Sequence, residues 1–175
     1  MRCIFLDFDG VINNWNHFDG VCLENALMLK KIVDLTDAKI VVTSSNKYPI
    51  QKNNDIDYYN SRFYKKYVQK LNEIGIEIYD ITPFCNCDRT FEIQKYLLDN
   101  EIESFVIVDD ELVSETLQEH QVFCDLYRGL QEEHIEPIIN ILNGKIGFYP
   151  ETYNRQETSN ELILRINRYY KKTRD

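Results

Sequence analysis

The chain has 175 residues, of which 43% are hydrophobic, and its formal net charge is −9. This length suits one domain with a sizeable core, and the composition excludes a disordered chain. The acidic balance argues against a protein that coats nucleic acid non-specifically, although it leaves room for a local basic groove. No stretch approaches the roughly 18 apolar residues of a membrane span, so we expect no membrane partner.

The N-terminal apolar run is too short for a signal peptide and stops at Asp7. The five cysteines are scattered along the chain, so we expect reduced thiols in a cytoplasmic protein. Cys85 and Cys87 form the one close pair, and two thiols without a second pair of ligands indicate zinc only weakly.

Strands and helices are expected to alternate along the chain, strands from short apolar runs and helices from apolar residues at helical spacing. In chain order we predict a strand at 2–6, a helix at 23–35, a strand at 39–42, a helix at 58–74, a strand at 76–81, a helix at 91–98, strands at 105–108 and 121–124, a helix at 135–142, a loop at 143–157 and a last amphipathic helix from 162.

Three features mark the ends of the predicted helices. Gly75 is placed where a helix C-cap belongs. Asp88 or Thr90 is the candidate N-cap of the helix at 91–98. Pro137 either kinks the helix at 135–142 or delays its start.

This alternation predicts an α/β fold, a Rossmann-like parallel five-stranded sheet with helices on both faces. We expect residues 1–142 to form the catalytic domain and residues 143–175 to form a loop and helix packed on that same domain. Ligands bind at the carboxyl ends of the strands in such sheets. Polar residues follow three of the predicted strands at that end, namely Asp7, Asp9, Thr43, Ser44, Asp109 and Asp110.

These residues predict a site for a metal and a phosphate. Two carboxylates as close as Asp7 and Asp9 repel each other unless a cation lies between them, and Asp109 or Asp110 would complete an oxygen ligand set. Magnesium is the expected ion. Each pair taken alone is commonly a strand end, a turn or a helix cap, so the prediction depends on their convergence.

Phosphate oxygens require further donors near the metal. Gly10 permits a sharp turn and opens backbone N–H groups to an anion, and Thr43 or Ser44 adds a hydroxyl group. A cation should neutralise the remaining charge. Arg89, at the start of a predicted helix, is the first candidate, with Lys95 and Lys47 as alternatives.

Several motifs resemble those of the haloacid dehalogenase (HAD) superfamily. Residues 6–12, Leu-Asp-Phe-Asp-Gly-Val-Ile, resemble its first motif, and Val-Val-Thr-Ser at 41–44 resembles its second. Arg89 is at the expected place of its third motif, and Val-Ile-Val-Asp-Asp at 106–110 resembles its fourth. The third motif commonly has a lysine, and arginine keeps the charge but changes the geometry. With Glu92-Ile93 and residues 129–133 included, the chain looks most like small HAD domains of Swiss Army knife RNA-repair proteins.

The resemblance implies a magnesium-dependent phosphohydrolase. Asp7 would attack phosphorus and form an aspartyl-phosphate, and Asp9 would act as general acid and then as general base. Magnesium would be held by Asp7, by Asp109 or Asp110, and by the backbone carbonyl of Asp9. The acid at position 9 favours phosphoryl transfer over dehalogenation.

The predicted insertions are small, so we expect a minimal cap or none. Residues 13–20, the flap segment, directly follow the loop that carries Asp7 and Asp9, the catalytic loop, and their Trp15 and Phe18 either stack on a nucleobase or pack the segment onto the domain. His17 is expected to take no part in catalysis. An open site suits a nucleic-acid end, a phosphoprotein or a nucleotide, which makes the protein a candidate nucleotidase. Another small phosphoester, or a non-catalytic interaction role for the same fold, remains an alternative.

Overall fold

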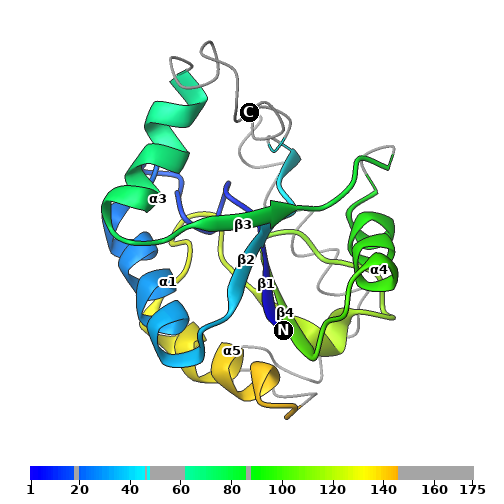
Figure 1. Cartoon of the computed structure of the whole chain (residues 1–175). Coiled ribbons are helices and arrows are strands. Elements are labelled where there is room, and N and C mark those ends of the chain that lie inside the picture. Colours follow the sequence, from blue (N-terminus) through cyan, green and yellow to red (C-terminus); the bar gives the residue numbers. More distant parts are fainter. Residues whose placement is uncertain (18–19, 46, 48–61, 86–87, 146–175) are drawn as a thin grey trace, which may run out of the picture.

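A parallel sheet of five strands forms the centre of the protein (Figure 1). This computed structural model describes residues 1–17, 20–45, 47, 62–85 and 88–145. The strands are β1 (Arg2–Leu6), β2 (Lys39–Val42), β3 (Ile78–Ile81), β4 (Ser104–Asp109) and β5 (Gln121–Phe123). They lie in the order β3-β2-β1-β4-β5, so the chain crosses from one half of the sheet to the other after β3.

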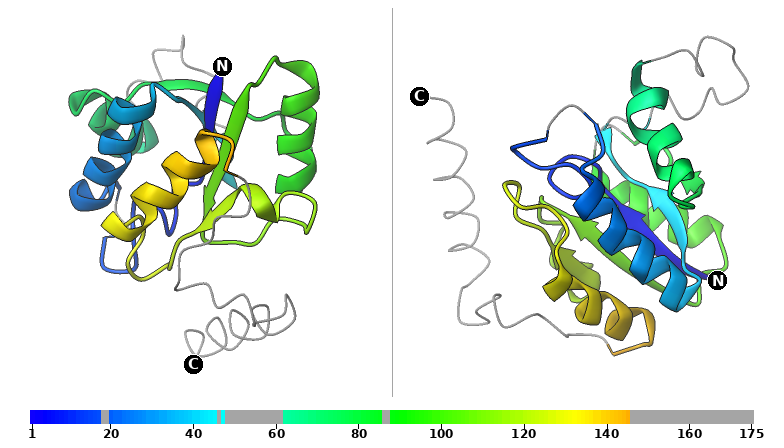
Figure 2. Two further views of the ribbon diagram at one scale, coloured as in Figure 1. Left: turned by 90° about the horizontal axis from the view of Figure 1, so that it is seen from below. Right: turned by 90° about the vertical axis from the view of Figure 1, so that its left-hand side faces the viewer.

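Helices cover both faces of the sheet (Figures 1 and 2). On one face are α1 (Leu23–Thr36), the π-helix η2 (Tyr64–Val68) with its continuation α3 (Gln69–Glu73), and α5 (Ile135–Leu142). On the other face is α4 (Arg89–Asp99). Two short 3₁₀ turns, η3 (Gln118–His120) and η4 (Glu132–His134), precede β5 and α5. The predicted parallel α/β sheet with helices on both faces is therefore confirmed.

Alternation along β1 divides the core in two, since successive strand residues face opposite sides of the sheet. Ile4 and Leu6 belong to the larger cluster, beneath α1, α3 and α5. Phe5 belongs to the smaller cluster beneath α4, where its ring meets Tyr96 edge-on at 5.6 Å between centroids. All three side chains are fully buried, so β1 is fixed from both sides.

The strand register brings the polar strand ends together. Leu6, the last residue of β1, is opposite Val42 of β2 and Val108 of β4. The ladders extend one step further, because the backbone N–H of Asp7 donates to Val108 O (3.0 Å) and that of Thr43 donates to Leu6 O (2.9 Å). The first polar residues after the central strands therefore lie at one edge of the sheet.

Several element boundaries differ from those predicted. The helix expected at 58–74 is described only from residue 62, and its middle is a π-helix, which no apolar spacing distinguishes from an α-helix. Asp88 is the N-cap of α4, since its Oδ1 accepts from the N–H of Phe91 (3.0 Å). Pro137 lies in the first turn of α5, where no N–H donor is needed, so the helix begins at Ile135 as predicted.

Three expectations fall outside the described part of the chain. The C-terminal helix predicted after residue 162 and most of the loop at 143–157 lie there, and so does Cys87 of the close cysteine pair. Among the described helices, none combines the length and the apolar character needed to cross a membrane.

Candidate active site

Three buried carboxylates converge at the carboxyl edge of the sheet. Asp7 follows β1, Asp109 ends β4 and Asp110 follows it, and one oxygen of each lies within 4.8 Å of the others. All three side chains are at most 7% exposed. The side chain of Asp9 lies outside this cluster, so any ligand role of that residue rests on its predicted backbone carbonyl.

Burial disfavours negative charge on all three groups. It raises the pKa of Asp7, and it raises the pKa of Asp109 and of Asp110 to about 8, with the charge of Asp7 adding to the effect at both. Arg89 acts in the opposite direction at each carboxyl group. Its single positive charge does not balance three carboxylates, so the cluster needs a further cation to be fully ionised.

The donor set fits a hard divalent cation. All three side chains offer oxygen atoms, which are the ligands that Mg²⁺ and Ca²⁺ prefer, and burial removes competing water. Exposed acidic groups are common on protein surfaces, but three buried carboxylates within ligand distance of one another are costly without a metal.

Gly10 makes room for this cluster. Its backbone has a φ of 70°, a left-handed conformation that L side chains rarely adopt. A Cβ atom at position 10 would also overlap the carboxylate of Asp110. The loop after β1 therefore approaches Asp110 more closely than any other residue type would allow.

Thr43 and Ser44 lie buried beside the carboxylates. The Ser44 hydroxyl forms a hydrogen bond with Asp7 that lowers the pKa of that carboxyl group. Thr43 is 1% exposed, and its Oγ1 has no hydrogen-bond partner among the described residues. Buried hydroxyl groups are nearly always satisfied, so this orphaned oxygen at the sheet edge is consistent with a ligand that brings a polar atom.

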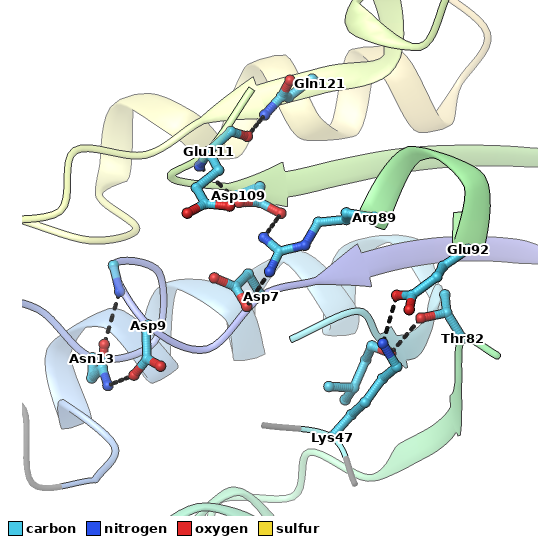
Figure 3. A network of polar contacts seen from close by, with 12 residues as sticks. Asp7, Asp9, Asn13, Lys47, Thr82, Arg89, Glu92, Asp109, Glu111 and Gln121 are labelled. Carbon is cyan, nitrogen blue, oxygen red and sulfur yellow. Dashed lines mark hydrogen bonds and ion pairs between the residues drawn. The ribbon is translucent and has the colours of Figure 1, made fainter. Parts of the chain in front are cut away.

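Arg89 supplies the cation of the site. It lies in the first turn of α4, and its guanidinium forms an ion pair with Asp109 and lies 3.5 Å from Asp7 Oδ1 (Figure 3). Burial alone would lower the pKa of Arg89, but Asp109 and Asp7 raise it above its ordinary value, so the group stays charged. Of the three predicted cations, this one lies among the carboxylates.

The two alternative cations have other partners. Lys95 is half-exposed and pairs with Asp99 on the surface of α4 (2.9 Å). Lys47 is 2% exposed, and its Nζ lies 2.6 Å from Glu92 Oε2 (Figure 3). The other oxygen of Glu92 accepts from the backbone N–H of Cys85 at 3.0 Å. This buried pair was not predicted, because its members are 45 residues apart in the sequence.

Asn13 holds Asp9 in the turn that follows β1. The Asn13 amide donates to Asp9 Oδ1 (2.6 Å) and to the hydroxyl of Tyr67 (3.2 Å), and it accepts from the N–H of Gly10 (2.8 Å). Asn13 was expected only as the first residue of the flap segment and Tyr67 only as part of the helix at 58–74, and this hydrogen-bond network was not predicted. The feature that could have drawn attention to Asn13 is its position in a tight turn, four residues after Asp9.

The flap segment is anchored to the domain at its start. The N–H of Trp15 donates to Leu126 O (3.0 Å), and the ring of Trp15 contacts Tyr127 with centroids 5.6 Å apart. Trp15 nevertheless remains 41% exposed, so the contact is compatible with both the packing and the stacking hypothesis. His17 is exposed, and Phe18 lies outside the described residues.

Comparison with known proteins gives one match. The family described as the HAD domain in Swiss Army Knife RNA repair proteins matches residues 3–135, which include every residue of the cluster described above. No curated protein and no solved structure matches the chain significantly.

Proposed function

Because the chain belongs to the family of HAD domains found in Swiss Army Knife RNA repair proteins, we propose that it is a magnesium-dependent phosphomonoesterase acting through an aspartyl-phosphate. The family itself points to a hydrolase of the HAD kind. The observation that carries the finer proposal is the convergence of Asp7, Asp109 and Asp110 with the guanidinium of Arg89.

The proposed reaction has two displacements at phosphorus. In the first, a carboxylate oxygen of Asp7 forms a bond to phosphorus as the bond to the leaving oxygen breaks, and Asp9 gives that oxygen a proton. In the second, Asp9 takes a proton from a water molecule, whose oxygen attacks phosphorus and breaks its bond to Asp7. Inorganic phosphate leaves, and both aspartates return to their starting states.

The surrounding residues would bind the transferring group. Arg89 would pair with phosphate oxygens, and the orphaned hydroxyl of Thr43 would donate to one of them. Asp7, Asp109 and Asp110 would hold the metal, with the backbone carbonyl of Asp9 as a further ligand. A bound magnesium ion would supply charge neutralisation between the anionic nucleophile and the anionic phosphate.

Two features support nucleotides or polynucleotide ends as substrates. Trp15 and Tyr127 form a partly exposed aromatic pair beside the catalytic loop, and aromatic rings stack well on bases. Residues 62–70 contain four basic residues and no acidic one, in a chain of net charge −9. This basic segment contacts the chain just after the flap segment, since Lys66 O accepts from the N–H of Val21 (3.3 Å). The positive charge of this segment would attract the phosphorylated end of a nucleic acid.

A substrate panel tests the proposal. Phosphate release is measured with magnesium for 5′- and 3′-phosphorylated oligonucleotides, mononucleotides, sugar phosphates and an aryl phosphate, with Asp7→Asn as the blank. We expect the highest kcat/KM on an oligonucleotide or nucleotide. A higher kcat/KM on sugar phosphates would show that the substrates are sugar phosphates and not nucleotides or oligonucleotides. Phosphate release by Asp7→Asn equal to that of the wild type would reject the mechanism.

A further inference from the structure

Both polar atoms of the Asn13 side chain form hydrogen bonds, two of the three within the turn that follows β1. It is fully buried, its Oδ1 accepts from the N–H of Gly10, and its Nδ2 donates to Asp9 and to Tyr67 (Figure 3 draws the first two contacts). The N–H of Gly10 can only donate, so the atom of Asn13 that faces it must be the oxygen. The amide nitrogen is thereby directed to the Asp9 carboxylate.

The contact between Asn13 and Asp9 is the shortest of the three. It joins an amide donor to a carboxylate oxygen at 2.6 Å, and hydrogen bonds to ionised acceptors are stronger than those between neutral groups. Rotating the Asn13 amide would break all three of its bonds at once. Asp9 itself is only partly buried and stands apart from the carboxylate cluster, so packing alone does not fix its orientation.

Tyr67 holds Asn13 from the other side. Its hydroxyl lies 3.2 Å from Asn13 Nδ2, and its ring stacks on that of Phe8 at 5.2 Å between centroids and 7° between planes. Phe8 is fully buried and stands between Asp7 and Asp9 in the sequence. Tyr67 belongs to the π-helix η2, and π-helical turns are frequent at functional sites.

We propose that Asn13 is a positioning residue for Asp9 and that Tyr67 fixes Asn13 in turn. This inference rests on the proposed function, since it assigns partners to its general acid. A general acid acts only when its oxygen is within hydrogen-bond reach of the leaving oxygen, and a carboxylate with one oxygen tethered samples fewer orientations. The hydrogen bonds from Tyr67 of η2 to Asn13 and from Asn13 to Asp9 therefore set how efficiently Asp9 protonates the leaving oxygen.

Two variants test the inference on two substrates, an alkyl phosphate with a poor leaving group and an activated aryl phosphate that needs little acid catalysis. Asn13→Ala is expected to lower kcat on the alkyl phosphate by roughly 10- to 100-fold, and on the aryl phosphate by less than about threefold. KM should change little on either. Tyr67→Phe, which keeps the ring stacked on Phe8, is expected to give a smaller difference in the same direction. We call this larger loss of kcat on the alkyl phosphate than on the aryl phosphate the leaving-group split.

Asn14→Ala is the matched control. Asn14 is also buried in this loop, but its amide donates to Asn25 (2.9 Å) and its oxygen accepts from the N–H of Asn16 (3.0 Å). Loosening the loop in this way should affect both substrates alike. Equal losses on the two substrates in both Asn13→Ala and Tyr67→Phe, or the same split in Asn14→Ala, would overturn the inference.

Asp9→Asn separates failure of this inference from failure of the proposed function. If Asp9→Asn shows the leaving-group split and the Asn13 and Tyr67 variants do not, Asp9 is the acid and its positioning by Asn13 is rejected. If Asp9→Asn shows no split, the acid role is rejected and the inference with it.

Discussion

Lys47 and Glu92 form an ion pair inside the protein, with 2.6 Å between Nζ and Oε2 and at most 3% exposure of either side chain. The N–H of Lys47 donates to Ser44 O (3.0 Å), and Glu92 lies one turn after Arg89 on α4. The pair thus joins the loop after β2 to the helix that carries the cation of the site. Both segments are proposed to bind the same phosphate.

Breaking this pair should destabilise the fold. We expect Glu92→Gln to lower the free energy of unfolding by about 3–5 kcal/mol, because it leaves the ammonium group of Lys47 buried without its counter-charge. Asp99→Asn, which removes the exposed partner of Lys95 on the same helix, should destabilise the protein far less, because water and salt screen an exposed pair. Denaturant titration of both variants measures the difference, and equal values would show that the buried pair contributes nothing special.

Asp7→Asn should abolish turnover without unfolding the protein. The amide cannot form the aspartyl-phosphate, so we expect kcat to fall by roughly 10³-fold or more. Burial raises the pKa of Asp7, so a neutral side chain should leave the thermal midpoint unchanged or raise it. Retention of more than a few per cent of the activity would exclude covalent catalysis by this residue.

The metal-free protein should lose stability as the pH rises. The pKa of Asp109 and of Asp110 is raised to about 8, so both groups hold protons to higher pH when folded than when unfolded. Their contribution is therefore complete below about pH 4 and is lost as the pH approaches 8. Thermal midpoints in chelator should fall over this range, less steeply in Asp110→Asn.

Magnesium should reverse that loss and restore activity. A cation bound by ionised Asp7, Asp109 and Asp110 stabilises the folded state by mass action, most strongly near pH 8, where the carboxylates repel one another. The midpoint should rise on titration with magnesium, and Asp109→Ala should need more of it. Full activity in excess chelator would contradict the assignment.

Trp15→Ala tests whether the aromatic pair binds a base. If it does, KM for an oligonucleotide should rise by roughly 5- to 100-fold, which corresponds to the stacking of one base, while KM for an aryl phosphate stays constant. Tyr79→Ala, which removes another exposed aromatic ring from β3, is the control. A lower thermal midpoint with equal changes of KM on every substrate would make Trp15 a packing residue.

Lys65→Glu tests the basic segment at 62–70. Lys65 is exposed, so reversing its charge should raise KM for a phosphorylated oligonucleotide several-fold at low salt and less at high salt. Lys39→Glu makes the same charge change at the start of β2, at the opposite edge of the sheet. Equal effects of the two variants would mean that only the net charge matters.

Local sequence patterns were enough to predict the strands and the edge where their polar ends meet. The apolar runs before Asp7, Thr43 and Asp109 predicted parallel strands, and their register brings these residues to one edge. The pairing of Lys47 with Glu92, and of Asn13 with Tyr67, joins residues 45 and 54 positions apart. Such contacts depend on how helices pack on the sheet, which no spacing along the chain specifies.

The close approach of Gly10 to Asp110 limits how the protein can change. Any side chain at position 10 is opposed both by the positive φ and by overlap with the Asp110 carboxylate. Alanine at position 110 would still keep a Cβ atom 2.8 Å from the added one, and any smaller residue there would remove one carboxylate of the cluster and leave the backbone strain. No single second substitution at position 110 restores both the fold and the cluster. Two positions 100 residues apart are therefore expected to behave as one unit in any mutational screen, with no compensating pair recovered.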